Sequence, residues 1–351
     1  KRLIWKRIGW QKEYGAKLSI HMWEHVAMKV LISTVPFADR DQTPLNILGE
    51  AGVEYVINPL GRKFTREELF QEISSYDALI AGTEVIDKEI INHSTNLKVI
   101  ARVGIGLDNV DLIAARDKGI QVCYTPDAPS PAVGELTIAM MLTMLRQVHI
   151  SNDQMHEGVW HRFFGKRLSE CTVGIIGAGR IGKHVLKLLS GFDVNRILVN
   201  DIDAELITEE PPKIENADKE KIYREADIIT VHVPLTMETT HMISDKEIRM
   251  MKRDAILINT ARGGIVDETA LFNALQNKRI GGAAVDVFEK EPYQGNLNKL
   301  TNCLLTAHMG SMSIDCRTQM EREATEDTVL FLLGKTPKRP VPNYEYENQT
   351  K

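Results

Sequence analysis

The chain has only four cysteines among its 351 residues, and they lie far apart at Cys123, Cys171, Cys303 and Cys316. It contains no C-x-x-C pair and no H-E-x-x-H motif, so neither a disulfide framework nor the ligand spacing of a zinc site is present. We therefore expect reduced and buried thiols, no bound metal, and a cytoplasmic protein.

Long apolar runs and an excess of positive charge are also absent. The uncharged helical stretch at 136–145 is about half as long as a membrane-spanning helix, which disfavours a membrane protein. The net charge is −5 and no basic stripe occurs, which disfavours a nucleic-acid partner. The composition, 43% hydrophobic and 26% charged, is that of a globular protein, and the length of 351 residues favours two domains.

Strand-like and helix-like segments alternate from residue 28 onward in two series, separated by the proline-rich segment 125–134. Such alternation predicts an α/β fold with doubly wound, mostly parallel sheets covered by helices on both faces. Residues 1–27 carry six Lys or Arg, two Glu and three of the four Trp, without the apolar core of a secretory signal. We expect residues 1–27 to lie outside the fold and the polar segment 335–351 to form a loose tail.

The motif TVGIIGAGRIG, residues 172–182, has the strand–turn–helix arrangement of a dinucleotide-binding loop. Gly177, Gly179 and Gly182 form G-x-G-x-x-G directly after a strand and at the start of a helix, where a dinucleotide pyrophosphate binds. Asp201 ends the next strand and would hold the ribose hydroxyls, although capping of a turn is an alternative role. A carboxylate there, followed by Ile202 and not arginine, favours NAD over NADP.

Three further strand-like segments end near ionisable side chains: Arg262 in INTARGG, Glu291 in AVDVFEKEP and His308 in CLLTAH. The carboxyl ends of parallel strands form the ligand-binding edge of such a sheet. His308 suits general acid/base catalysis, and Glu291 would orient the ring and favour its protonated form. Arg262 keeps its proton, and its forked donors suit a substrate carboxylate and the neighbouring carbonyl oxygen. Each residue alone has a structural explanation, but together they predict a hydride-transferring dehydrogenase.

These segments, with ARVGIGLDNVD at 101–111, resemble the D-isomer-specific 2-hydroxyacid dehydrogenases, especially the D-3-phosphoglycerate dehydrogenase branch. The resemblance covers about residues 29–334. It implies a Rossmann-type NAD-binding domain (128–313) inserted in a flavodoxin-like substrate domain (28–127 plus 314–334). It also implies that Arg262, Glu291 and His308 are the catalytic residues.

The resemblance further implies which residues contact the ligands. The NAD contacts are Gly177, Gly179, Arg180, Ile181, Gly182, Asp201, Val233, Pro234, Thr260, Ala261, Arg262, Asp286, His308, Gly310 and Ser311. The substrate is held by Arg102 and Arg262, and its carboxylate by the backbone amides of Val103, Gly104 and Ile105. Arg102, Arg116 and Arg146 resemble phosphate-side arginines of the phosphoglycerate branch, and ordinary surface or helix arginines are the open alternative.

The expected function is NAD-dependent interconversion of a D-2-hydroxyacid and its 2-keto acid, first of all 3-phosphoglycerate and 3-phosphohydroxypyruvate in serine biosynthesis. Two alternatives stay open: a glyoxylate or hydroxypyruvate reductase, and an NAD-sensing binding protein like the co-repressors built on this fold. The expected partners are the small-molecule acid and a second copy of the chain. The resemblance implies a homodimer supported by the long helix after Pro131.

Overall fold

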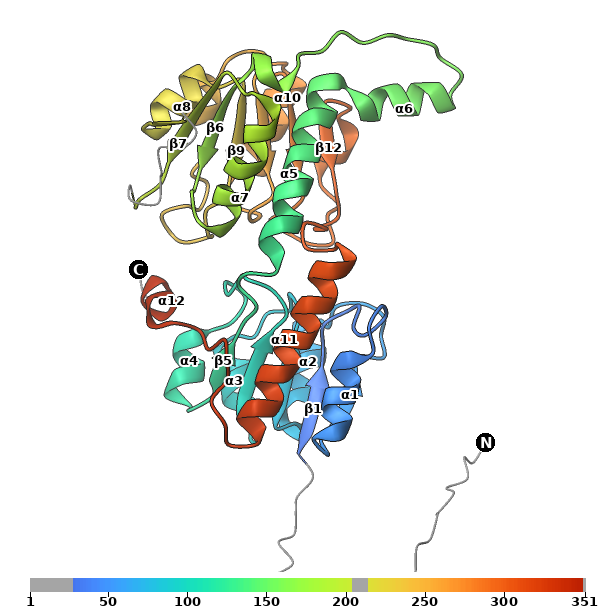
Figure 1. Cartoon of the computed structure of the whole chain (residues 1–351), viewed down its shortest axis with the longest axis vertical. Helices are drawn as coiled ribbons and strands as arrows, with labels where there is room; N and C mark the ends of the chain where they lie inside the picture. Colours follow the sequence, from blue (N-terminus) through green and yellow to red (C-terminus); the bar gives the residue numbers. More distant parts are fainter. Residues whose placement is uncertain (1–27, 204–213, 350–351) are drawn as a thin grey trace, which may run out of the picture.

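The computed structural model describes residues 28–203 and 214–349, which form two parallel β-sheets stacked one above the other in Figure 1. The chain passes from the first sheet to the second along helix α5 (Pro129–Arg146) and returns along α11 (Ile314–Leu332). The segment 1–27, expected to be an extension, lies outside the described residues.

The first sheet has the flavodoxin-like strand order 2-1-3-4-5. Its strands, in spatial order, are β2 (Glu54–Ile57), β1 (Lys29–Ile32), β3 (Ala78–Ala81), β4 (Val99–Arg102) and β5 (Gln121–Cys123). Its helices are α1 (Thr43–Glu50), α2 (Arg66–Glu72), α3 (Lys88–His93), α4 (Leu112–Asp117) and the returning α11. Strands β3 and β4 are buried along their whole length because helices cover both faces, which explains their near-continuous apolar sequences.

The second sheet has the strand order of a dinucleotide-binding fold. Its strands, in spatial order, are β12 (Cys303–Leu305), β11 (Gly282–Val285), β10 (Ile256–Asn259), β9 (Ile228–Val231), β6 (Thr172–Ile176), β7 (Arg196–Asn200) and β8 (Ile214–Asn216). The other helices are α6 (Val148–His156), α7 (Arg180–Leu189), α8 (Lys219–Glu225), α9 (Asp245–Met250), α10 (Glu268–Gln276) and α12 (Asn343–Asn348). The order reverses between β6 and β9, so a crevice opens beyond their carboxyl ends.

The two parallel sheets confirm the predicted fold class. The structure differs from the sequence prediction at residues 335–349, which were expected to be loose. There Val341 N–H donates to the Val122 carbonyl (3.0 Å), Tyr124 N–H donates to the Arg339 carbonyl (3.2 Å), and α12 follows. Backbone pairing with the edge strand β5 orders this segment in a way that its polar composition does not reveal.

No helix among the described residues is both long enough and apolar enough to cross a membrane. The four cysteines are buried and free, and burial raises the pKa of each thiol.

Candidate active site

Two cavities of about 840 and 720 Å³ open between the sheets, at the strand ends where each sheet reverses its order. The first is lined by Gly179 to Ile181, by the segment after β9, and by 105–114 from the opposite domain. The second is lined by Glu291, His308 and Arg262 on one side and by Ser33, Glu84 and Arg102 on the other. The two domains therefore contribute opposite walls of one site.

The glycine motif has the backbone that a dinucleotide loop requires. Gly177 has φ +99°, and a Cβ there would lie 2.6 Å from the His232 carbonyl oxygen. A Cβ on Gly182 would lie 2.0 Å from the Gly177 carbonyl oxygen, so helix and strand pack too closely for any side chain. Gly179, at the start of α7, has no heavy atom within 4 Å of its Cβ position and caps the helix without a side chain. The resulting open turn at the N-terminus of α7 fits the pyrophosphate of NAD.

Asp201 lies at the end of β7, next to the glycine motif. Its carboxylate accepts hydrogen bonds from Ala178 N–H (2.5 Å) and Asp203 N–H (2.9 Å). Asp201 therefore holds the backbone of the cofactor-binding turn, and its partly exposed position leaves it open to a ribose. The capping role and the ribose-binding role are compatible in this geometry.

Replacing Asp201 with serine should raise the KM for NADH about 10- to 100-fold and lower the preference for NADH over NADPH. The reason is that a charge-assisted hydrogen bond is lost and the like-charge barrier to a 2′-phosphate disappears. Steady-state kinetics with both cofactors measure this, and Asp203→Ser, which removes the next acidic side chain, is the control. Unchanged cofactor selectivity in Asp201→Ser would count against the assignment.

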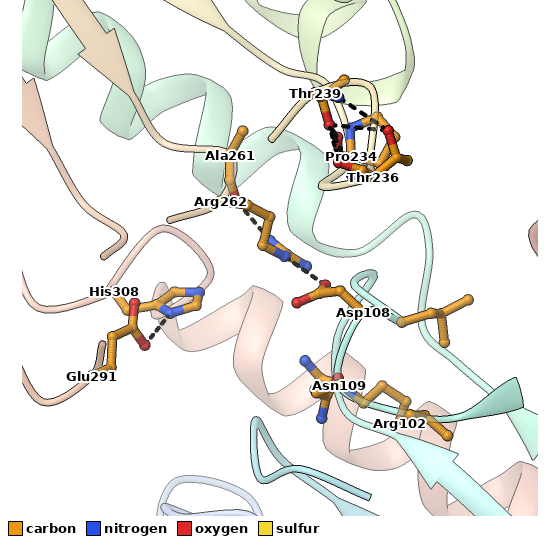
Figure 2. Close-up of polar contacts among 12 residues, drawn as sticks. Arg102, Asp108, Asn109, Pro234, Thr236, Thr239, Ala261, Arg262, Glu291 and His308 are labelled. Carbon is orange, nitrogen blue, oxygen red and sulfur yellow. Dashed lines mark hydrogen bonds and ion pairs between the residues drawn. The ribbon is translucent and has the colours of Figure 1, made fainter. Parts of the chain in front are cut away.

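The histidine and the glutamate predicted from the strand ends form a direct pair. His308 Nδ1 lies 2.8 Å from Glu291 Oε2 (Figure 2). The other oxygen, Oε1, accepts a hydrogen bond from Phe288 N–H (3.1 Å). Burial raises the pKa of the Glu291 carboxyl group, but the hydrogen bond from His308 and the charge of the ring outweigh it, so the net pKa lies below its usual value. Because Nδ1 is occupied by a carboxylate, Nε2 is the ring nitrogen that remains for a substrate.

The turn that carries His308 is held by Asp286, which was predicted only as an NAD contact. Its carboxylate accepts hydrogen bonds from Thr306 Oγ1 (2.5 Å), Met309 N–H (2.9 Å) and Gly310 N–H (2.9 Å). Thr260, also predicted as an NAD contact, hydrogen-bonds Thr137 through its hydroxyl (2.9 Å). Both residues line the second cavity, so these internal bonds set the shape of its wall.

Arg262 is paired with Asp108, a residue that the sequence analysis did not single out. Arg262 Nε donates to Asp108 Oδ1 (2.8 Å), and Nη1 donates to the Ala261 carbonyl (2.7 Å). In Figure 2 its side chain points toward Asp108 from the opposite domain. Burial raises the pKa of Asp108, but the charge of Arg262 and its hydrogen bond together have the larger, opposite effect. The net pKa of Asp108 therefore lies below its usual value. The one signal in the sequence was an acidic residue directly after the apolar segment VGIGL.

The loop that faces Arg262 has no room for side chains at one point. A Cβ on Gly106 would lie 1.4 Å from Arg262 Nη2. Of the three amides expected to receive the substrate carboxylate, Val103 N–H donates to the Ala81 carbonyl (2.9 Å) and Gly104 N–H to Thr125 Oγ1 (2.8 Å). Within 28–203 and 214–349, no acceptor pairs with the N–H of Ile105, which is left as the free donor of the predicted three.

Arg102, Arg116 and Arg146 were the arginines that resemble phosphate-binding residues, and of these only Arg102 lines the second cavity. Arg102 is 5% exposed, and it donates from Nη1 to the Val103 carbonyl (2.8 Å) and from Nε to Asn109 Oδ1 (3.2 Å). Burial and the like charge of Arg262 lower the pKa of Arg102 to about 10. Arg116 instead stacks on Tyr346 (5.7 Å), and Arg146 ends α5.

Comparison with known proteins places these features among dehydrogenases. Residues 138–310 match the family model described as D-isomer specific 2-hydroxyacid dehydrogenase, NAD binding domain. The chain is 39% identical over 283 residues to a glyoxylate reductase of Thermofilum pendens, covering 78% of this chain and 83% of the relative. It is 37% identical over 310 residues to a D-3-phosphoglycerate dehydrogenase of Methanocaldococcus jannaschii, covering 86% of this chain and 58% of the relative. The NAD-bound 3-phosphoglycerate dehydrogenase of Entamoeba histolytica superposes with a TM-score of 0.76 at 28% identity, over 90% of this chain and 99% of that one.

Proposed function

The chain belongs to the D-isomer-specific 2-hydroxyacid dehydrogenase family and uses NAD, and we propose that its substrate pair is 3-phosphoglycerate and 3-phosphohydroxypyruvate. The observation that supports this pair is Arg102, a buried guanidinium in the wall of the substrate cavity. Among the described residues no carboxylate lies within ion-pair distance of it. An unpaired buried cation favours an anionic group at the distal end of the substrate.

We propose the following roles for the residues of this chain. Arg262 grips the substrate carboxylate and polarises the C2 oxygen, with Ile105 N–H as a further donor. His308 Nε2 takes the proton from the C2 hydroxyl during oxidation and returns it during reduction, while Glu291 stabilises the charged ring. Bound NAD supplies the acceptor for the hydride that leaves C2. Both the bonding electrons and the proton of the alcohol are thereby accounted for.

A second substrate assignment, reduction of glyoxylate or hydroxypyruvate, is favoured by two other observations. The glyoxylate reductase of Thermofilum pendens aligns over 83% of its own length, whereas the phosphoglycerate dehydrogenase of Methanocaldococcus jannaschii aligns over 58%. Glu84, buried at the same end of the cavity as Arg102, would oppose a doubly charged phosphate. Its carboxylate accepts hydrogen bonds from Ser33 Oγ and from Gly82 N–H (3.0 Å).

Steady-state oxidation of NADH with phosphohydroxypyruvate, hydroxypyruvate, glyoxylate and pyruvate tests the choice. We expect the highest kcat/KM with phosphohydroxypyruvate, by about tenfold or more, since a charge-assisted contact contributes about 1.5–3 kcal/mol. Arg102→Lys, which keeps the charge but loses the fork, should lower that advantage and leave glyoxylate turnover nearly unchanged. A preference for glyoxylate or hydroxypyruvate would support the second assignment. No turnover with any of the four would contradict both.

We also propose that the chain forms a homodimer through α6 and the segment that follows it. This part projects from the domain of the second sheet in Figure 1 and exposes large apolar side chains, including Trp160 at 75% and Phe164 at 100% exposure. Met155 and Val159 are exposed beside them. Several large apolar side chains exposed in one short segment are typical of a protein interface.

A further inference from the structure

Residues 339–349, called the strap here, run from α11 along β5 and end between the two domains. Pro340 pairs with Cys123 in an antiparallel bridge, and Arg339 is anchored to α11 by an ion pair with Asp327 (3.0 Å). Helix α12 then lies beside α4, at the level of the gap between the domains in Figure 1. Its residues Glu345 and Asn348 line the larger cavity, together with Gly179 and Arg180.

Gln349 at the end of the strap fastens the substrate loop, defined as residues 103–112. Its Nε2 donates to the carbonyls of Leu107 (3.1 Å) and Val110 (2.8 Å), and its Oε1 accepts from Leu112 N–H (2.9 Å). One side-chain amide therefore satisfies three backbone groups of the loop that carries Asp108. Asp108 in this loop is paired with Arg262. By holding the loop in place, Gln349 therefore helps to position the arginine that we expect to bind the substrate.

Tyr344, five residues earlier in the strap, contacts the cofactor loop, defined as residues 177–182. Burial lowers the pKa of Arg180, the first residue of α7, but interaction with the Tyr344 hydroxyl and with Asp127 outweighs it and raises that pKa. Burial raises the pKa of Tyr124 after β5, and Tyr344 adds to the rise. Arg180 is also paired with Asp127 (2.8 Å). Arg180 directly follows Gly179, the open position of the pyrophosphate cradle, so a bound dinucleotide phosphate would meet this guanidinium.

We propose that Tyr344 and Gln349 are positioning residues that couple the cofactor loop to the substrate loop, so that NAD binding at Arg180 stabilises the loop that holds Asp108 and Arg262. Tyr344 lies in helix α12, of six residues, and Gln349 directly follows this helix, which gives the two side chains a fixed spacing. Coupling of this kind requires that both sites bias the same structural element. The strap is bonded to the substrate loop through Gln349, and its residues Glu345 and Asn348 line the same cavity as Gly179 and Arg180. The inference requires only NAD binding and is independent of which keto acid is the substrate.

Hydrogen exchange measured by mass spectrometry, with and without saturating NADH and no keto acid, tests the coupling. In the wild-type chain we expect NADH to slow exchange of the amides of residues 105–112 several-fold. In Tyr344→Phe and in Gln349→Ala this NADH-dependent slowing should disappear, although NADH still binds. Tyr346→Phe, which removes a hydroxyl from the same helix and keeps the ring beside Arg116, should retain the slowing.

Three results would overturn the proposal. The first is no NADH-dependent slowing of residues 105–112 in the wild-type chain, and the second is slowing of wild-type size in both variants. The third is faster exchange in the variants by the same factor with and without NADH, which would indicate a purely structural role. Thermal unfolding identifies variants that fail to fold, and Gln349→Glu, which keeps the shape but loses both donated bonds, then replaces Gln349→Ala.

Discussion

Replacing His308 with asparagine should lower kcat/KM by about 10²- to 10⁴-fold, because the general acid/base of the reaction is lost. Asparagine suits this position, since His308 has φ +49° and asparagine tolerates the left-handed region. The KM for NADH should change much less than kcat/KM, because the ring of His308 acts on the substrate hydroxyl. The measurement is steady-state kinetics in both directions, together with NADH titration to show that the cofactor still binds.

The chain contains a matched control for this experiment. His241 also has a positive φ of 51° and also pairs with a carboxylate, Glu289, at 3.2 Å, but it lies on the surface. His241→Asn removes the same chemical group in the same backbone conformation and should keep wild-type activity. Wild-type activity in His308→Asn, or equal losses in both variants, would contradict the proposed role of His308.

The partner of His308 adds a pH dependence to this prediction. The pKa of Glu291 lies below its usual value of 4.5, so its carboxylate is ionised throughout pH 5–8. Its contribution to stability is present above about pH 4.5 and is lost as the pH falls through the lower folded value. Glu291→Gln should therefore lower kcat/KM about 10- to 100-fold across pH 5–8, because the charged ring loses its counter-ion. Wild-type kcat/KM in Glu291→Gln throughout pH 5–8 would contradict a role of Glu291 in the chemistry.

Replacing Arg262 with alanine should raise the KM for the keto acid and lower kcat together, with a loss in kcat of about 10²- to 10³-fold. The reason is that Arg262 is expected to contact both the carboxylate and the oxygen on which charge develops, as an oxyanion-hole donor does. Steady-state kinetics with the preferred keto acid measure both parameters. Arg249→Ala, which breaks a surface pair with Asp245 (2.7 Å), is the control.

The contact with Asp108 makes this prediction sharper. Asp108→Asn leaves Arg262 in place but weakens the bond that orients it, so we expect a smaller loss of about tenfold. Since the two side chains are in direct contact, the double variant Asp108→Asn, Arg262→Ala should lose little more than Arg262→Ala alone. Fully additive losses would show that Asp108 acts separately from Arg262, and wild-type kinetics in Arg262→Ala would refute the role of the arginine.

The sequence by itself determined the features that depend on local patterns. The alternation of segments predicted two doubly wound sheets, and the glycine spacing predicted the cofactor loop, because turn geometry and close packing impose residue types at short range. The spacing of Thr65 and Glu68 is also typical of a capping box, and both bonds of the box are present: Glu68 N–H donates to Thr65 Oγ1 (3.2 Å) and Thr65 N–H to Glu68 Oε2 (2.8 Å). The proximity of Glu291 and His308 was also predictable, because neighbouring parallel strands end at one edge.

Only the tertiary structure decided how the two domains meet. Asp108 and Arg262 are 154 positions apart, and Gln349 lies more than 200 positions from the substrate loop, so no local pattern pairs them. No local pattern distinguishes Arg102 from Arg116 and Arg146 either, yet of these three only Arg102 lines the second cavity. Side-chain pairing across a cleft depends on the relative placement of separate sheets, and a single sequence carries no periodic signal for that placement.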